Sequence, residues 1–134
     1  MFVRDYEDKD FSSLNNLLID VYGVRKEKCD TNNIELVSIY NDIVIGYLTL
    51  TIIHDSVKNI NWGMVNYVCV DKNYRKKGVA TNLFKKVLKI CEDKKISYIE
   101  LTSNEKRVEA HALYKKLGFN IRNTTVFRKE LLWL

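Results

Sequence analysis

A single stretch of the sequence, residues 65–91, most constrains what this chain can fold into. Its first part, VNYVCV, is short and rich in β-branched residues, which predicts a buried strand. Turn-forming residues at 71–73 follow. After them, apolar residues recur at the spacing of one helix face, at Ala80, Leu83, Phe84, Val87, Leu88 and Cys91. We therefore expect a strand, a tight loop and a helix in direct succession.

The loop between that strand and that helix reads RKKGVA and has the chemistry of an anion site. The first amides of a helix have no intrahelical partner and carry partial positive charge, and Arg75, Lys76 and Lys77 add full charges. Gly78 lets a bulky anion approach the backbone, and the small Ala80 keeps the helix start open.

Three rival motifs are missing from the sequence. It contains no Gly-x-x-x-x-Gly-Lys-(Ser/Thr) loop, no Gly-x-Gly-x-x-Gly fingerprint and no Gly-x-Ser-x-Gly nucleophile elbow. The sequence therefore disfavours ATP binding, NAD binding and triad-type hydrolysis.

The pattern Arg75-x-x-Gly78-x-Ala80 after a Val-rich strand resembles the (Gln/Arg)-x-x-Gly-x-(Gly/Ala) pyrophosphate loop of the GNAT superfamily of acyl-CoA-dependent N-acyltransferases. A second block, YIELTSN and then AHALYKKLGF within 98–119, is similar to the family's fifth strand and tyrosine-bearing helix. The resemblance implies an α/β fold, a single GNAT-like domain over 1–134. Its mixed, twisted sheet would have about six to seven strands flanked by helices, with the fourth and fifth strands splayed.

The resemblance also implies acetyl-CoA as cosubstrate, with the pantetheine arm along the strand and the diphosphate on the loop. By position, the expected contacts are Val68, Cys69, Val70, Arg75, Lys76, Lys77, Gly78, Val79, Ala80, Thr81 and Asn104. Asn104 has an alternative role as the N-cap of the following helix.

Acyl transfer in this family implies direct attack of an amine on the thioester, with the oxyanion held by backbone amides near Val70. Tyr114 matches the family's tyrosine. Because a tyrosine with a pKa near 10 is a weaker acid than a thiol near 8.5, Tyr114 would hydrogen-bond the developing thiolate rather than protonate it fully. The alternative is that Tyr114 is a core aromatic on the helix face of Leu113 and Leu117.

The proton acceptor is less clear from the sequence. Many relatives place a glutamate where this chain has Asn66, whose amide cannot act as a base. Asn66 either positions the acceptor substrate or is a plain polar strand residue. Because an alkyl amine has a pKa near 10.4, either water carries its proton to Asp20, Glu27, His54 or His111, or the substrate is a less basic amine. The acceptor itself stays open: a small amine, an antibiotic, a peptide terminus or a protein lysine.

Composition bounds the class of protein. With 134 residues, 46% apolar and 29% charged, the chain fits one ordinary domain. No window approaches a membrane span and no secretory signal opens the chain, so we expect a cytoplasmic protein with no membrane contact. Cys29, Cys69 and Cys91 are odd in number and widely spaced, which predicts free thiols and no metal site.

Charge is divided unevenly along the chain. Residues 1–60 carry a net charge of −4 and residues 61–134 a net charge of +9. This division favours a polyanionic cofactor in the second part and a cationic amine near the first. No nucleic-acid partner is expected, since no zinc finger, recognition helix or aromatic-basic sheet pattern is present. The alternative function is a catalytically weak acyl-CoA sensor or interaction module.

The remaining elements are expected from periodicity and turn residues. These are a strand at 2–4, a helix at 8–22 ended by Gly23, a short helix at 25–29, a hairpin of 34–40 and 43–53, a loop at 54–62, a strand at 96–102, a helix at 105–117, and strands at 119–121 and 125–131. Gly46 marks a bulge or a close backbone approach, or it is a plain glycine of an edge strand. The apolar tail at 132–134 packs either on the core or against a second copy in a homodimer.

Overall fold

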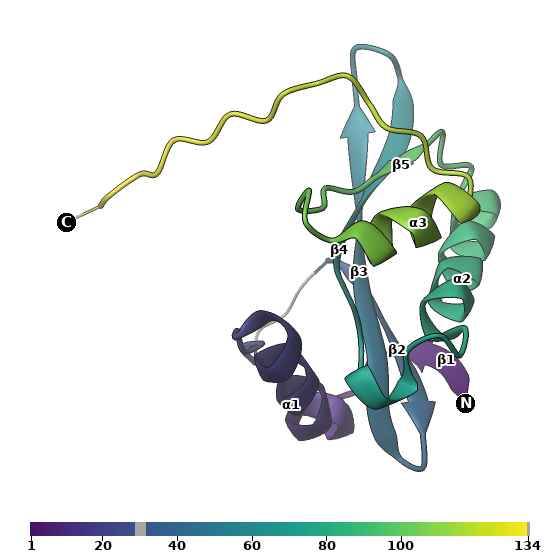
Figure 1. The fold of residues 1–134 in the computed structure, drawn as a ribbon. Coiled ribbons are helices and arrows are strands. Elements are labelled where there is room, and N and C mark those ends of the chain that lie inside the picture. The colour runs from purple at the N-terminus through teal and green to yellow at the C-terminus, as the bar shows by residue number, and fades with distance from the viewer. Residues whose placement is uncertain (29–31, 134) are drawn as a thin grey trace. The chain divides into compact units, whose positions relative to one another are not determined.

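The computed structural model describes residues 1–28 and 32–133 (Figure 1). By internal packing the chain divides into two compact units, Met1–Thr102 and Ser103–Leu134. The first unit contains a five-stranded sheet and two α-helices, and the second contains one α-helix and a C-terminal segment.

The sheet of the first unit is mixed and has the strand order β1-β2-β3-β4-β5. Its strands are β1 (Phe2–Asp5), β2 (Ile34–Tyr40), β3 (Ile43–Asp55), β4 (Ile60–Val70) and β5 (Ile99–Glu100). Neighbours pair antiparallel from β1 to β4, whereas β5 is parallel to β4. The expected α/β fold with a mixed sheet is confirmed, with five strands in the described residues instead of six or seven.

Two helices cover opposite faces of this sheet. Helix α1 (Phe11–Tyr22) follows a 3-10 turn, η1 (Asp8–Asp10), and ends at Gly23. It shares a buried cluster with Tyr47 of β3 and Cys69 of β4. Helix α2 (Val79–Lys94) packs close to Gly46, the residue before Tyr47. Because successive strand residues point to opposite faces, α1 and α2 lie on opposite sides.

The β3–β4 hairpin is longer than the sequence indicates. The prediction of a loop over 54–62 is wrong, because Ile53 pairs with Trp62 and His54 with Asn61. Nδ1 of His54 lies 2.8 Å from Oδ1 of Asn61, so polar side chains that suggested a loop pair across the strands instead. Only residues 56–59 form the turn.

The predicted short helix at 25–29 is absent from its described part, residues 24–28, and Cys29 lies outside the described residues. The physical reason is a pair of hydrogen bonds to α1. The Lys26 amide donates to Oδ1 of Asn15 at 2.6 Å, and Nδ2 of Asn15 donates to the Lys26 carbonyl at 3.4 Å. Asn15 thus holds the Lys26 backbone from both sides.

The strand predicted at 96–102 and the helix predicted at 105–117 are both shorter in the structure. β5 has two residues where 96–102 was expected, and α3 (Val108–Lys116) begins three residues later than the predicted 105–117. The carboxamide of Asn104 accepts from the Lys106 amide at 2.9 Å, which makes a local turn, and Arg107 takes the N-cap position that was expected for Asn104.

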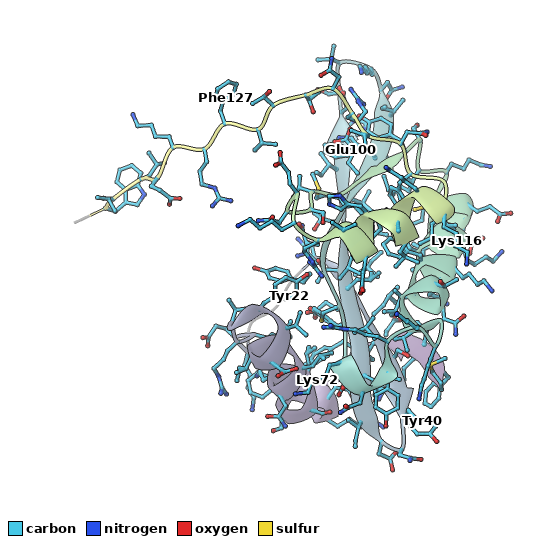
Figure 2. All side chains as sticks on the ribbon, in the orientation of Figure 1. Tyr22, Tyr40, Lys72, Glu100, Lys116 and Phe127 are labelled. Atoms are coloured by element: carbon cyan, nitrogen blue, oxygen red, sulfur yellow. The ribbon has the colours of Figure 1, made fainter. Side chains whose placement is uncertain are left out.

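The predicted strands at 119–121 and 125–131 do not form. The C-terminal segment to residue 133 has neither helix nor strand, and Phe127 is 92% exposed (Figure 2). Its β-branched and aromatic residues indicate a fit to a sheet surface, but a strand also requires a ladder with a partner.

Candidate functional site

The connection from β4 to α2 is a well-ordered turn. Oδ1 of Asp71 accepts from the Asn73 amide at 2.8 Å and so starts the 3-10 helix η2 (Lys72–Tyr74). Arg75 is extended, with φ −68° and ψ 155°. Lys76 then takes φ +61° and Gly78 φ +80°, both left-handed. Left-handed residues of this kind occur in anion-binding nests, where successive backbone amides point toward one side.

The start of α2 supplies backbone donors that no side chain caps. Its N-cap is Gly78, and the first turn holds no acidic residue. The Asn82 amide donates to the Gly78 carbonyl at 3.0 Å, so the amides of Val79, Ala80 and Thr81 precede the first intrahelical bond of this kind. These are the donors that a helix start offers to an anion.

This helix start is open to a ligand. Gly78 is exposed, and a Cβ atom there would meet no other atom within 4 Å. The side chains of Arg75, Lys76 and Lys77 are also exposed, and Nζ of Lys77 lies 5.6 Å from the ring centroid of Tyr74. The sequence prediction of a cationic loop at a helix N-terminus is therefore matched by the geometry.

Strands β4 and β5 pair only at one end. Their parallel ladder joins Gly63 to Ile99 and Met64 to Glu100, and β4 then continues to Val70 without pairing with β5. Stacking of Trp62 on Tyr98, with ring centroids 5.5 Å apart, anchors the paired end. The unpaired half of β4 is the edge along which the sequence predicts the pantetheine arm, at Val68 to Val70.

A bulge interrupts β4 at the start of this edge. Tyr47 of β3 pairs with Cys69 and Thr49 with Asn66, so β4 has one residue more than β3 between these pairs. The extra length is accommodated by Tyr67, whose φ is +54°. Cross-strand partners share a face, so Asn66 lies on the α1 face with Thr49, where it is exposed.

Tyr22, the last residue of α1, contacts the bulge in two ways (Figure 2). Its hydroxyl donates a hydrogen bond to the Val68 carbonyl at 2.8 Å, and its ring meets the Tyr67 ring edge-on at 5.6 Å. A left-handed non-glycine residue costs about 1–3 kcal/mol. A buried hydrogen bond contributes about 1 kcal/mol and an aromatic pair about 0.5–1.5 kcal/mol, so Tyr22 offsets the strain.

Neither Tyr22 nor Tyr67 was found from the sequence. VNYVCV has the composition of a regular strand, and no glycine or asparagine stands at position 67 to mark a left-handed residue. Tyr22 lies at the predicted helix end, where an aromatic residue is unremarkable. No local signal could have identified this pair.

Tyr47 is a tyrosine on the α1 face that is unsuited to proton transfer. Its hydroxyl donates to Oε1 of Glu35 at 2.6 Å, and Nζ of Lys26 lies 3.1 Å from the same oxygen. Burial, together with the Glu35 carboxylate, raises the pKa of Tyr47 well above its usual range. We assign Tyr47 to the packing of α1 on the sheet.

The four candidate proton acceptors lie in different places. His54 faces Asn61 near the hairpin turn, and at about 3.3 Å per residue Asn61 is roughly 16 Å along β4 from Asn66. Asp20 lies on α1 and Glu27 in the segment after it, both exposed. His111 belongs to α3 of the second unit. Among the three candidates of the first unit, Asp20, Glu27 and His54, it is His54 that lies beside the end of β4 distant from Asn66.

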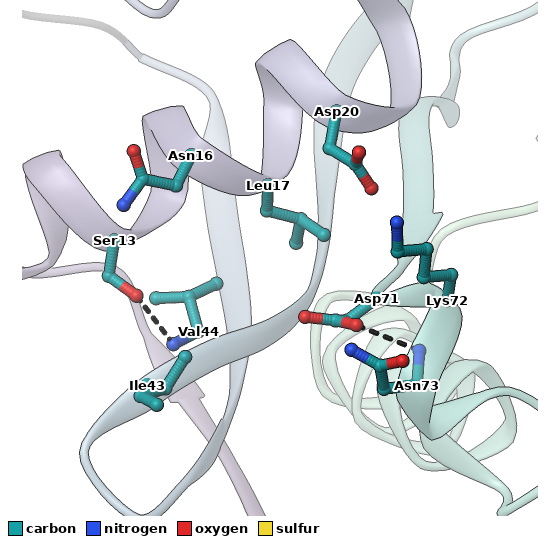
Figure 3. A pocket seen from close by; sticks show the side chains of 9 residues that line it. All are labelled: Ser13, Asn16, Leu17, Asp20, Ile43, Val44, Asp71, Lys72 and Asn73. Carbon is teal, nitrogen blue, oxygen red and sulfur yellow. Dashed lines mark hydrogen bonds between the residues drawn. The ribbon is translucent and has the colours of Figure 1, made fainter.

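A cavity of about 240 Å³ lies between α1, the start of β3 and the β4–α2 turn (Figure 3). Asp20, Asp71 and Lys72 contribute charged groups to its lining, and Leu17 and Val44 contribute apolar surface. The cavity therefore places Asp20 beside the carboxyl end of β4, on the α1 face of the sheet.

Tyr114 and Asn104 belong to the second unit. Tyr114 is the buried residue of α3, its ring meets the Phe119 ring at 5.9 Å, and its carbonyl accepts from the Phe119 amide at 2.9 Å. Asn104 is exposed in the turn before α3. The catalytic role of Tyr114 and the cofactor role of Asn104 stay predictions.

Cys69 and Cys91 are buried, and burial raises the pKa of the Cys91 thiol. Within residues 1–28 and 32–133, no group of three or more His, Cys, Asp or Glu side chains could hold a metal ion. None of the helices in the described part of the chain has the length and apolarity needed to cross a bilayer.

The Acetyltransferase (GNAT) family model matches residues 2–119. The chain belongs to the GNAT acetyltransferase family. This match covers the helix start, the bulged strand and the helix of Tyr114 together, and it confirms the resemblance drawn from RKKGVA and AHALYKKLGF.

Individual relatives agree with this assignment. The chain is 29% identical over 93 residues to the L-amino acid N-acetyltransferase AaaT of Escherichia coli K12, covering 67% of this chain and 55% of that protein. It thus spans about half the length of this curated relative.

Two solved structures share the fold. A transcriptional regulator from Bacillus halodurans C-125 matches with a TM-score of 0.84 at 20% identity, over 96% of this chain and 98% of that one. The ribosomal-protein-alanine N-acetyltransferase from Brucella melitensis biovar Abortus 2308 matches with a TM-score of 0.83 at 15% identity, over 98% of this chain and 100% of that one.

Proposed function

We propose that this protein transfers an acetyl group from acetyl-CoA to a primary amine by direct attack. The observation that carries the proposal is the uncapped start of α2 behind an exposed cationic loop. Three backbone amides and three cationic side chains are available there to a diphosphate, and Gly78 leaves room for it. This is the chemistry that coenzyme A requires of its binding loop.

In this proposal each part of the chain has a defined task. The amides of Val79 to Thr81 bind the diphosphate, with Arg75, Lys76 and Lys77 around it. The pantetheine arm follows the edge of β4 at Val68, Cys69 and Val70. Asn104 contacts the arm, Asn66 contacts the acceptor, and both units act together as one catalytic domain over residues 1–134.

Acetyl transfer needs no reagent other than acetyl-CoA and the amine. The neutral amine nitrogen forms a bond to the thioester carbon, the carbonyl oxygen becomes an oxyanion held by backbone amides near Val70, and the C–S bond then breaks. Coenzyme A leaves as a thiolate that Tyr114 stabilises by a hydrogen bond. The proton lost by the ammonium adduct ends on the thiol or in solvent.

We infer that the acceptor is a small amine and place L-amino acids first in the panel to be tested. The support is the name of the Escherichia coli relative and the cavity beside Asp20, whose volume of about 240 Å³ suits a small ligand. Its two carboxylates, at Asp20 and Asp71, outnumber its one cation, at Lys72, which favours a cationic amine by charge complementarity.

One observation favours a second candidate function, a sensor or interaction module that binds acyl-CoA without efficient turnover. Asn66 occupies the strand position where many relatives have a glutamate, and its amide cannot accept a proton from the amine. A protein with an intact CoA loop and no base would bind acetyl-CoA and turn it over slowly.

Thiol release separates the two functions. The protein is incubated with acetyl-CoA and a panel of L-amino acids, aminoglycosides and peptides, and the product is identified by mass. Release of thiol with an acetylated product of one amine class is expected. Tight CoA binding without turnover across the panel would instead establish the module, and absence of CoA binding would contradict both.

A further inference from the structure

We propose that Tyr22 is a positioning residue for acyl transfer, because it holds the bulge at the start of the unpaired edge of β4, where the thioester is expected. This inference rests on the acetyltransferase function proposed above. It assigns a task to the end of α1 that neither the family match nor the relatives assign.

The two contacts of Tyr22 enclose the strained residue of β4. Its ring meets the ring of Tyr67, which has φ +54°, and its hydroxyl donates to the carbonyl of the next residue, Val68. Because a peptide group is planar, fixing the Val68 oxygen also fixes the orientation of the amide of Cys69. Tyr22 therefore holds both the Tyr67 side chain and the plane of the peptide between Val68 and Cys69.

The bulge needs this support because it leaves the β3 ladder. Val68 has no cross-strand partner in the β3–β4 register, which passes from Asn66 to Cys69, and the parallel ladder with β5 ends at Met64. A buried carbonyl withdrawn from its ladder needs another donor. The hydroxyl of Tyr22, at 2.8 Å, provides it.

Tyr22 is itself rigidly held. It is the last residue of α1, and the amide of the following Gly23, with φ +67°, donates back to the Ile19 carbonyl at 2.9 Å. Leu14, Leu17 and Leu18 fix α1 in the buried cluster. The packing of α1 is thereby transmitted to the peptide at Val68, beside the edge where the acyl group is expected.

The test compares Tyr22→Phe with Tyr40→Phe in the full chain. Tyr22→Phe keeps the ring contact with Tyr67 and removes the hydrogen bond to Val68, whereas Tyr40→Phe, at the end of β2, keeps its ring contact with Tyr74 and serves as the control. For both variants we would measure kcat, the KM for acetyl-CoA, the Kd for CoA and amide hydrogen exchange of residues 66–70.

Tyr22→Phe is expected to lower kcat about 10-fold or more, because misplaced donors slow the reaction strongly. It should leave the Kd for CoA within twofold and raise amide exchange at the bulge. Tyr40→Phe should change none of these values more than twofold. An unchanged kcat in Tyr22→Phe would overturn the proposal, as would a loss of kcat matched by an equal loss of CoA binding.

The two proposals fail in different ways. A wild-type protein that turns over no amine contradicts the acetyltransferase function and, with it, the catalytic role of Tyr22. A wild-type protein that turns over, with amide exchange at residues 66–70 unaffected by Tyr22→Phe, contradicts the role of Tyr22 alone.

Discussion

A Cβ atom at Gly46 would lie only 2.6 Å from Cγ1 of Val79, the first residue of α2. The β3 backbone thus directly supports the helix start that forms the candidate anion site. The structure thus confirms a close backbone approach at Gly46. It also confirms a bulge, since the β2–β3 register shifts beside Ser38, the partner of Gly46. The close packing of Gly46 on Val79 therefore helps to set the position of the start of α2.

We expect Gly46→Ala to push Val79 outward and to weaken CoA binding. Overpacking of this kind costs about 1–3 kcal/mol of unfolding free energy. Calorimetric titration with CoA and denaturant unfolding would measure the two effects together.

Gly63→Ala is the matched control, because its Cβ would lie 2.8 Å from Leu50 Cδ1 and Gly63 is far along β4 from Val70, the partner of Gly46 beside the start of α2. It should lose comparable stability with little change in the Kd for CoA. Equal losses of CoA affinity in the Gly46→Ala and Gly63→Ala variants would show that Gly46 has no specific effect on the helix start.

Replacing Tyr114 by Phe tests the predicted thiolate partner. The ring and its packing on Phe119 are kept and only the hydroxyl is lost. We expect kcat to fall about 10–100-fold, the scale of one lost transition-state hydrogen bond, with the Kd for CoA unchanged. A variant with normal kcat would show that Tyr114 serves only as a packed aromatic residue.

The pH dependence of the rate tests the meaning of Asn66. Without a carboxylate at this position, the rate should rise about 10-fold per pH unit below the amine pKa, near 8 for a peptide terminus and 10.4 for a lysine. Asn66→Glu should raise the rate at pH 7 and flatten this slope, while Asn66→Gln should do neither. A wild-type rate independent of pH between 6 and 9 would show that another residue already takes the proton.

Acid stability depends on the pair between Arg4 and Asp10. The Arg4 guanidinium donates to both carboxylate oxygens of Asp10, at 2.7 and 2.8 Å, and the Glu7 amide adds a third bond at 2.9 Å. The Arg4 bonds, with the Glu7 amide, hold the pKa of Asp10 below its ordinary value of 3.8. Stability from this carboxylate is therefore complete above about pH 4 and is lost as the pH falls through the lowered pKa.

Asp10→Asn should lower the unfolding free energy at pH 7 by about 2 kcal/mol and weaken its dependence on acid. Asp8→Asn, at an exposed residue of the same turn, is the control and should stay within about 0.5 kcal/mol of the wild type. Urea unfolding at pH 7 and pH 3 measures both. An acid dependence in Asp10→Asn equal to that of the wild type would contradict the assignment.

The sequence predicted the part of the site whose causes are local. The charges of RKKGVA, the missing side chain of Gly78 and the periodic helix after it all lie within one short stretch, and the structure places them as expected. The hairpin of β2 and β3 likewise followed from strand composition and the turn at Asn41 and Asp42.

The rest depended on contacts between distant residues. The positive φ of Tyr67 is stabilised by Tyr22, which is far away in the chain, so no local pattern marks it. The strands predicted at 119–121 and 125–131 failed for a related reason, because strand composition does not supply a hydrogen-bonding partner.

A negative charge introduced at position 78 would test the anion site while the backbone conformation is kept. Asp and Asn both tolerate the left-handed conformation better than other side chains, and a Cβ atom at Gly78 meets no neighbour within 4 Å. Gly78→Asn and Gly78→Asp therefore differ mainly by one negative charge at the start of α2.

The most direct measurement is the Kd for CoA of the wild type, Gly78→Asn and Gly78→Asp at low and high salt. We predict that the wild type binds CoA, that Asp weakens binding at least about 10-fold more than Asn, and that this difference shrinks as salt screens the charge. A wild type that does not bind CoA, or equal affinities for the two variants, would contradict a diphosphate site at the start of α2.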